Sequence, residues 1–421
     1  MGDRAPHKTL FLVNFAVTLG FGIADAFFPT YLFGLGARGF MLGLPLVLYS
    51  LSKILFSPVL GACADRIGYR RIILASLFLY LAVSVGYLCT HEFAALIMLR
   101  LAQGVSCAMF RPVMLAMVGS ATGKEERGRV MATFDISFYA PLGLGPLIGG
   151  ALKDAWGFPG IFAAVTLLSL AAFLFALRRL PQASVRGGCA GGVPGGGVVP
   201  LWGLRRGSYR GLLAFIFGRA CGISLSGSFL PILLSSKLGL SGLRSGLVLA
   251  SGTAAMTLLL RPMGILSDRA PRPLLVLLGG GTVSLLYLVV PAAADFGTML
   301  ALAVAIGVFS VVSQPASSAL LIEEGTRYGM GATVGTFNAV LNAGFVAGPL
   351  LGALLQGTLG LTAVFHAAGA VGLAAVALFA AELWGSVPRS AAAPPEHEEV
   401  TVLAPRATVS CESAPPFSHA A

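Results

Sequence analysis

Few ionisable residues interrupt the long apolar stretches of this chain, and two of them can be paired by depth. Asp25 lies about eight residues and Arg100 about seven residues from the same predicted end of their stretches, which for a helix is roughly 10–12 Å. A neighbouring arginine keeps a carboxylate ionised, whereas apolar surroundings alone favour its protonated form. A conformational change that separates the pair could therefore drive proton uptake. The alternative is a static structural ion pair.

Arg111 and Asp135 form a second candidate pair near the opposite end, each roughly 9–12 Å deep if the stretches are helical. The residues 203 positions later are Gln314 and Asn338, so an amide pair would replace the charged pair. A lone buried charge is costly, and a matched replacement is therefore expected if the two positions touch. The sequence thus offers four candidates for proton coupling: Asp25, Arg100, Asp135 and Arg111.

The amide pair belongs to a repeat that covers much of the chain. With a shift of 203 positions and no insertion between 61 and 149, Gly61, Asp65, Arg66, Pro112, Gly145, Pro146 and Gly149 recur as Gly264, Asp268, Arg269, Pro315, Gly348, Pro349 and Gly352. Tandem repeats of long apolar segments are typical of secondary transporters, in which two halves rock about a central site.

The composition indicates that these stretches lie in lipid. The chain is 56% hydrophobic and 11% charged, against about 25% charged residues in soluble domains. Stretches of about 20 apolar residues can span a bilayer as helices. They are expected at 9–33, 40–61, 72–90, 93–119, 129–152, 159–178, 210–235, 243–265, 273–292, 296–321, 329–355 and 360–384. The sequence therefore predicts an all-α membrane protein with twelve transmembrane helices in two pseudo-symmetric six-helix halves.

The polar segments divide the chain into four parts. The first half covers residues 1–179, and the second covers 210–384. Residues 180–209 are rich in glycine and proline and are expected to form a flexible cytoplasmic linker. Residues 385–421 have few large apolar side chains and are expected to form a disordered cytoplasmic tail.

The net charge of +11 is best explained by topology. Most of the 28 Lys and Arg residues fall in loops on one side of the predicted helices, whereas Arg38, Lys153, Lys237 and Arg244 lie in loops on the other side. The positive-inside rule then places both termini in the cytoplasm. The basic residues are not clustered on a soluble domain, so nucleic-acid binding is not expected.

Motifs for catalysis are missing from the sequence. The six cysteines contain no CxxC pair, and neither a metal site nor a disulfide framework is predicted. Gly119 to Lys124 lacks the spacing of a phosphate-binding loop. We expect no enzyme activity, no cofactor and no use of ATP.

The loop after the second predicted helix carries a family signature. Residues 61–71 read GACADRIGYRR, which resembles the cytoplasmic G-x-L-a-D-r-x-G-r-k/r motif of the major facilitator superfamily, with departures at Cys63 and Tyr69. The second half holds a degenerate copy. The resemblance implies a conformational latch at the cytoplasmic rim, formed by Gly61, Asp65, Arg66, Gly68, Arg70, Asp268 and Arg269.

Two further motifs narrow the resemblance. Arg100, Gln103 and Gly104 are similar to the l-x-x-x-R-x-x-q-G pattern common in proton-coupled members of the family. Gly145, Pro146 and Gly149 match the C-terminal part of the motif of its antiporters, and the second half has a fuller copy. These motifs imply a role in helix packing and gating for Gln103, Gly104, Gly145, Pro146, Gly149, Gly344, Gly348, Pro349 and Gly352.

The resemblance covers about residues 9–384 and looks closest to the drug:proton antiporter group, including sugar-efflux relatives. It implies proton-driven efflux of a small lipophilic molecule by a monomer in a bacterial inner membrane. An importer of a small organic anion is the main alternative, because Lys53 and Arg219 add cations at membrane depth. A receptor or scaffold that transports nothing is the third. Intramembrane Asp25 argues against it, because such residues are usually functional.

Overall fold

The computed structural model describes residues 5–120, 127–180, 208–328 and 330–386, and every regular element in these ranges is helical. Almost all of the predicted linker and tail therefore lies outside the described residues. Long apolar side chains such as Leu258, Leu167 and Phe78 remain exposed on the helices. Such surfaces are stable in lipid and costly in water. The protein is an integral membrane protein.

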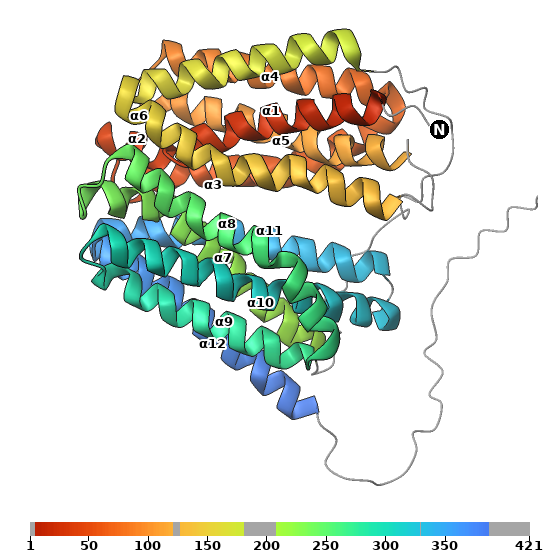
Figure 1. The fold of residues 1–421 in the computed structure, drawn as a ribbon, viewed down its shortest axis with the longest axis vertical. Coiled ribbons are helices and arrows are strands. Elements are labelled where there is room, and N and C mark those ends of the chain that lie inside the picture. The colour runs from red at the N-terminus through yellow and green to blue at the C-terminus, as the bar shows by residue number, and fades with distance from the viewer. Residues whose placement is uncertain (1–4, 121–126, 181–207, 329, 387–421) are drawn as a thin grey trace, which may run out of the picture. The chain divides into compact units, whose positions relative to one another are not determined.

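Six helices make up the first half, drawn from red to yellow in Figure 1. They are α1 (Ala5–Asp25), α2 (Phe28–Gly34), α3 (Phe40–Ile67), α4 (Tyr69–Cys89), α5 (Phe93–Ser120) and α6 (Arg127–Arg179). The first predicted span thus consists of two helices. Pro29 lies in the first turn of α2, where the missing N–H of proline costs no helical hydrogen bond.

Helix α6 covers two predicted spans. Its backbone leaves helical geometry at Gly157, where φ is +66°. Glycine adopts this conformation at no steric cost, so the chain kinks there without a separate loop. By length and composition, eleven helical segments of the described residues could cross a membrane, and the 44-residue segment from Ile136 to Arg179 contains the kink. The count is consistent with twelve spans.

The second half is drawn from green to blue in Figure 1. Its elements are α7 (Ser208–Ser236), α8 (Gly242–Arg269), α9 (Arg272–Val289), the short 3₁₀ helix η2 (Val290–Ala292), α10 (Phe296–Tyr328), α11 (Met330–Thr358) and α12 (Leu361–Ser386).

Packing follows the repeat. Helix α1 packs on α6, where Gly145 and Gly149 approach it closely, and its counterpart α7 packs on α11. Between the halves, α6 packs on α8 and α3 packs on α11, which are again corresponding pairs. We call the end of the helices that holds Gly39, Gly157 and Gly242 the Gly39 end, and the opposite end the Gly68 end. The sequence predicts that the Gly39 end faces outward.

Candidate functional site

Asp25 and Arg100 are in direct contact between α1 and α5. Arg100 Nη1 donates to Asp25 Oδ1 at 2.6 Å. The arginine side chain is 1% exposed, whereas the aspartate side chain is 35% exposed. The structure thus confirms the contact between the two residues that were paired by their expected depth in the membrane. The pair combines a fully buried cation with a partly exposed carboxylate.

Arg100 has further partners that do not depend on the charge of Asp25. Its Nη1 also donates to Gln103 Oε1 at 3.1 Å, and the same oxygen accepts from the Tyr87 hydroxyl at 3.0 Å. The ring of Phe28 lies 3.4 Å from the guanidinium carbon. A buried cation that loses its carboxylate costs about 3–5 kcal/mol. An amide and an aromatic face offset part of that cost, so Arg100 keeps two partners when Asp25 is neutral.

Gly104 allows α5 and α3 to approach closely beside this pair. A Cβ at Gly104 would overlap Ser52 Oγ and the Tyr49 carbonyl. The close approach places Tyr49 near the buried arginine, with its ring 5.9 Å from the guanidinium carbon. Gln103 and Gly104 thus have distinct roles: the first is a hydrogen-bond acceptor, and the second provides space.

The second predicted pair is described only in part. Arg111 lies with its guanidinium carbon 3.5 Å from the ring of Phe138, on α6. The side chain of Asp135 lies outside the described residues, so its contact with Arg111 stays a prediction. In the second half, Gln314 accepts a hydrogen bond from Arg219 at 2.7 Å, a partner that the depth argument did not propose.

The latch residues contact their own half where they are described. Gly68 joins α3 to α4 with φ at +101°, a conformation that favours glycine. Arg70 donates to the Leu177 carbonyl at 3.0 Å, and Asp268 lies 3.9 Å from Arg272.

Arg66 and Arg269 are exposed. The surroundings of Gly61 and the side chain of Asp65 are outside the described part of the structure. The described residues therefore do not test a latch between the halves, and its role stays a prediction.

The Gly-Pro motif of α6 presents two faces to two different helices. A Cβ at Gly145 would lie 2.5 Å from the backbone of Gly22, and one at Gly149 would lie 2.6 Å from the Ile23 carbonyl oxygen, both on α1. The Pro146 carbonyl instead meets Gly246 on α8, in the other half. Helix α6 therefore packs tightly on its own half and on the opposite half at once.

The second half repeats this arrangement. Gly344, Gly348 and Gly352 approach α7 closely, within their own half. The Pro349 carbonyl oxygen would lie 2.7 Å from a Cβ at Gly43 on α3. Gly43 and Gly246 are 203 positions apart, as are Pro146 and Pro349. Two equivalent glycine–proline crossings thus join the halves.

Hydrogen bonds between the halves cap helix starts at the Gly39 end. Asp154 accepts from the N–H groups of Gly242 at 2.5 Å and Leu243 at 2.8 Å, at the start of α8. At the start of α3, Gly39 N–H donates to Gln356 Oε1 at 2.7 Å. The first N–H groups of a helix have no partner within it, so each half satisfies donors of the other.

We call the two crossings and two caps together the outer gate, a name that follows the predicted outward orientation of the Gly39 end and its predicted role. It consists of Gly39, Gly43, Pro146, Asp154, Gly242, Leu243, Gly246, Pro349 and Gln356. Toward the Gly68 end, by contrast, Gly264 on α8 and Gly335 on α11 have open space where a Cβ would project. In the described residues, the recorded close approaches between the halves gather toward the Gly39 end.

Sequence reasoning missed most of the gate. It singled out Pro146 and Pro349 but neither their glycine partners nor the capping residues. A signal was present, because Gly39 and Gly43 recur as Gly242 and Gly246 with the same shift of 203. These four glycines precede the first residue of each copy of the repeat described above, Gly61 and Gly264.

Asp154→Asn should weaken the gate. The amide keeps an acceptor oxygen but loses the charge that favours a helix N-terminus, a contribution of about 0.3–1 kcal/mol. We expect the ratio of closed to open molecules at this end to fall roughly two- to fivefold. Double electron–electron resonance between spin labels at Trp156 and Leu359, in a cysteine-free background, would measure it.

Asp295→Asn is the matched control for that change. Asp295 caps the start of α10 by accepting from Thr298 N–H at 2.7 Å and from its hydroxyl at 3.1 Å, inside one half. Its loss should leave the distance distribution unchanged. An equal shift in both variants would show that Asp154 is an ordinary cap without a gating role.

A family model described as Major Facilitator Superfamily matches residues 10–209 and 212–417, in two copies that correspond to the two halves. The chain belongs to this superfamily. It is a transporter-family membrane protein, as the motifs at 61–71 and around Arg100 predicted.

Individual relatives are distant. The quinolone resistance protein NorA of Staphylococcus aureus is 27% identical over 175 residues, 41% of this chain and 45% of NorA. The multidrug transporter AQR1 of Candida glabrata is 28% identical over 142 residues, 34% of this chain and 24% of AQR1. The chain thus spans less than half the length of these curated relatives. A crystal structure of the nucleoside transporter NupG shares the fold, with a TM-score of 0.73, 14% identity, and coverage of 89% of this chain and 99% of NupG.

Proposed function

We propose that this protein is a proton-driven exporter that moves a small lipophilic molecule by alternating access. The observation that carries the proposal is the ion pair between buried Arg100 and partly exposed Asp25. An ionisable pair inside a membrane protein is expensive and is usually retained for function. NorA is named a quinolone resistance protein, which supports export, and AQR1 is named a multidrug transporter, which supports the substrate class.

In the proposed cycle, the described state is closed at the outer gate and holds Asp25 ionised beside Arg100. Substrate binds from the cytoplasmic side in this state. After the halves rock, the substrate leaves outward and a proton binds Asp25. Arg100 then keeps Gln103 and Phe28 as partners. Return to the described state releases the proton inward, because the approach of Arg100 favours the carboxylate.

Helix α6 is the proposed mechanical link between proton and gate. Gly22 lies three residues before Asp25 on α1 and packs against Gly145 on α6. The next residue, Pro146, packs against Gly246 of the other half. A shift of α1 on neutralisation of Asp25 would therefore reach the outer gate through one rigid helix.

Orientation and assembly belong to the same proposal. Both termini are placed in the cytoplasm by the distribution of Lys and Arg, and the membrane is proposed to be a bacterial inner membrane that holds the protein as a monomer. The halves are proposed to be residues 1–179 and 210–384, joined by the cytoplasmic segment 180–209.

Purified protein in liposomes tests the export reaction. With an acidic lumen, an antiporter lets protons leave in exchange for external substrate, so ethidium should accumulate inside and leave when nigericin collapses the pH difference. Ethidium is a permanent cation, so acid trapping cannot produce the signal. Accumulation that requires an alkaline lumen would indicate symport and overturn export.

A further inference from the structure

Arg219 is a cation inside the second half whose recorded partner is neutral. It lies ten residues after Tyr209 on α7, about 15 Å along the helix axis and therefore near the middle of a membrane span. Its Nη2 donates to Gln314 Oε1 at 2.7 Å. None of the ion pairs recorded in the described residues includes it.

Arg219 and Arg100 differ in the charge of their partners. Both arginines are in membrane-spanning helices, but Arg100 has Asp25 at 2.6 Å and Arg219 has an amide in the described residues. An amide oxygen offers a partial charge, which does not neutralise a guanidinium in a medium of low dielectric constant. A charge in this position calls for an anion, and the described part of the protein does not supply one.

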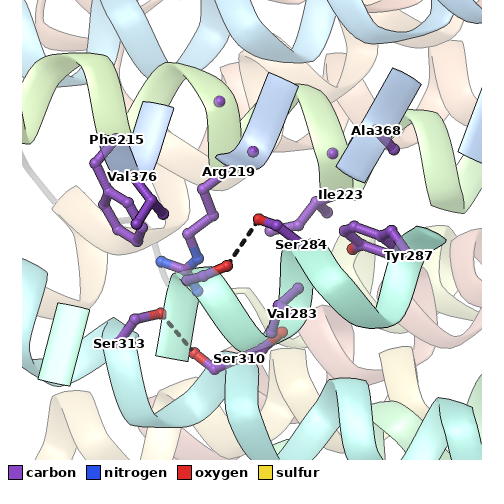
Figure 2. A pocket seen from close by; sticks show the side chains of 14 residues that line it. Phe215, Arg219, Ile223, Val283, Ser284, Tyr287, Ser310, Ser313, Ala368 and Val376 are labelled. Carbon is purple, nitrogen blue, oxygen red and sulfur yellow. Dashed lines mark hydrogen bonds between the residues drawn. The ribbon is translucent and has the colours of Figure 1, made fainter. Parts of the chain in front are cut away.

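A small cavity lies beside the guanidinium. Figure 2 shows Arg219 reaching from α7 toward Ser310 and Ser313 on α10, with Ser284 and Tyr287 of α9 nearby. The space available is about 20 Å³. One water-sized group needs about 10–15 Å³, so the cavity can hold a single small group and excludes a whole drug-sized molecule.

The cavity lining offers donors as well as charge. The guanidinium has five N–H groups, one of which is used by Gln314. The hydroxyls of Ser284 and Ser313 donate to the carbonyls of Gly280 and Ser310. For the Ser310 hydroxyl no hydrogen bond is recorded among the described residues. A charged donor and a hydroxyl donor around a space of this size suit an oxyanion or a halide.

We propose that the pocket formed by Arg219, Ser310, Ser313 and their neighbours on α9 binds one small anionic group, such as chloride or the carboxylate of a larger molecule. The site does not depend on proton coupling at Asp25. Its failure and that of the proposed export reaction are thus separable.

Thermal unfolding of the purified protein tests binding without transport. Benzoate should raise the midpoint of wild-type protein by roughly 2–4 °C, whereas benzamide, its uncharged analogue, should not. Asp25→Asn protein should respond as wild type does. Arg219→Gln should remove the response, and Arg219→Lys should keep part of it because the charge remains. An undiminished benzoate shift in Arg219→Gln, or equal shifts with benzamide, would overturn the site.

Sodium chloride, compared with HEPES buffer of equal ionic strength, distinguishes the source of the anion. If chloride raises the midpoint and blocks the benzoate shift, the pocket takes a free inorganic anion. If benzoate acts and chloride does not, the pocket recognises an organic carboxylate. No shift with either anion would contradict the proposal.

If Arg219→Gln does not fold, a variant with a carboxylate built into the pocket tests the proposal instead. Ser310→Asp places a carboxylate in the pocket, so its unfolding midpoint should exceed that of Ser310→Asn, which has the same shape without charge. The benzoate response should also disappear. A Ser310→Asp protein that is less stable than Ser310→Asn would show that the pocket does not accept an anion.

Discussion

Asp25→Asn should abolish accumulation of ethidium driven by a pH difference while leaving downhill exchange intact. The amide cannot take up a proton, so no proton current can be coupled to the substrate, although both conformations remain accessible. We expect the pH-driven gradient to fall at least tenfold, to the level of protein-free liposomes. Ethidium uptake with an acidic lumen, and ethidium exchange without a pH difference, measure the two properties separately.

Folding is the first control for this variant. Arg100 keeps Gln103 and the ring of Phe28 when Asp25 is neutral, so Asp25→Asn should be recovered as folded protein. Asp295→Asn removes a carboxylate that caps α10 inside one half and should keep coupling. If Asp25→Asn still concentrates ethidium, Asp25 is not the coupling residue, and Asp135 or an uncoupled mechanism becomes the better explanation.

Gly246→Ala should open the outer gate. The new Cβ would overlap the Pro146 carbonyl oxygen, a backbone atom that cannot rotate away. Overpacking of this kind costs about 1–3 kcal/mol, and the cost applies only while the halves are together at the Gly39 end. The closed-to-open ratio should therefore fall roughly 5- to 150-fold. Spin labels at Trp156 and Leu359 should show a new population at longer distance.

Gly264→Ala is the matched control, since it makes the same change on the same helix. Apart from its chain neighbours and the adjacent backbone of its own helix, no atom lies within 4 Å of the Cβ that it adds. Alanine in place of a helical glycine stabilises by about 0.5–1 kcal/mol. This variant should not lengthen the distance between the labels. A distribution for Gly246→Ala that matches wild type would show that the crossing tolerates a methyl group and does not set the state.

Much of the candidate site was predictable from the sequence because it depends on distances along single helices. The rise of 1.5 Å per residue fixes the depth of a side chain once the ends of its helix are known, and Asp25 and Arg100 were matched on that basis. The motif at 61–71 and the shift of 203 between the halves are properties of the sequence itself. They indicate the superfamily without any information about tertiary contacts.

The tertiary structure decided which helices meet. Gly145 and Pro146 are neighbours in sequence, yet one packs on α1 and the other on α8, because successive residues of a helix point in directions about 100° apart. Asp154 falls between the predicted spans 129–152 and 159–178, and its partners Gly242 and Leu243 lie 88 and 89 positions away. Arg219 could be placed at membrane depth from sequence, but its pairing with Gln314 required the packing of α7 on α10.

There is a physical reason why the sequence predicts the helices and their depth but not the contacts between them. Hydrophobicity and backbone hydrogen bonding are settled within each span, since a chain in lipid must satisfy its N–H and C=O groups locally. Contacts between halves that rock form and break during the cycle, so one sequence must be compatible with at least two sets of them. The sequence alone thus determined the spans, the repeat and the depth of each charge. The tertiary structure determined that the halves meet through the Asp154 and Gln356 caps and the two glycine–proline crossings.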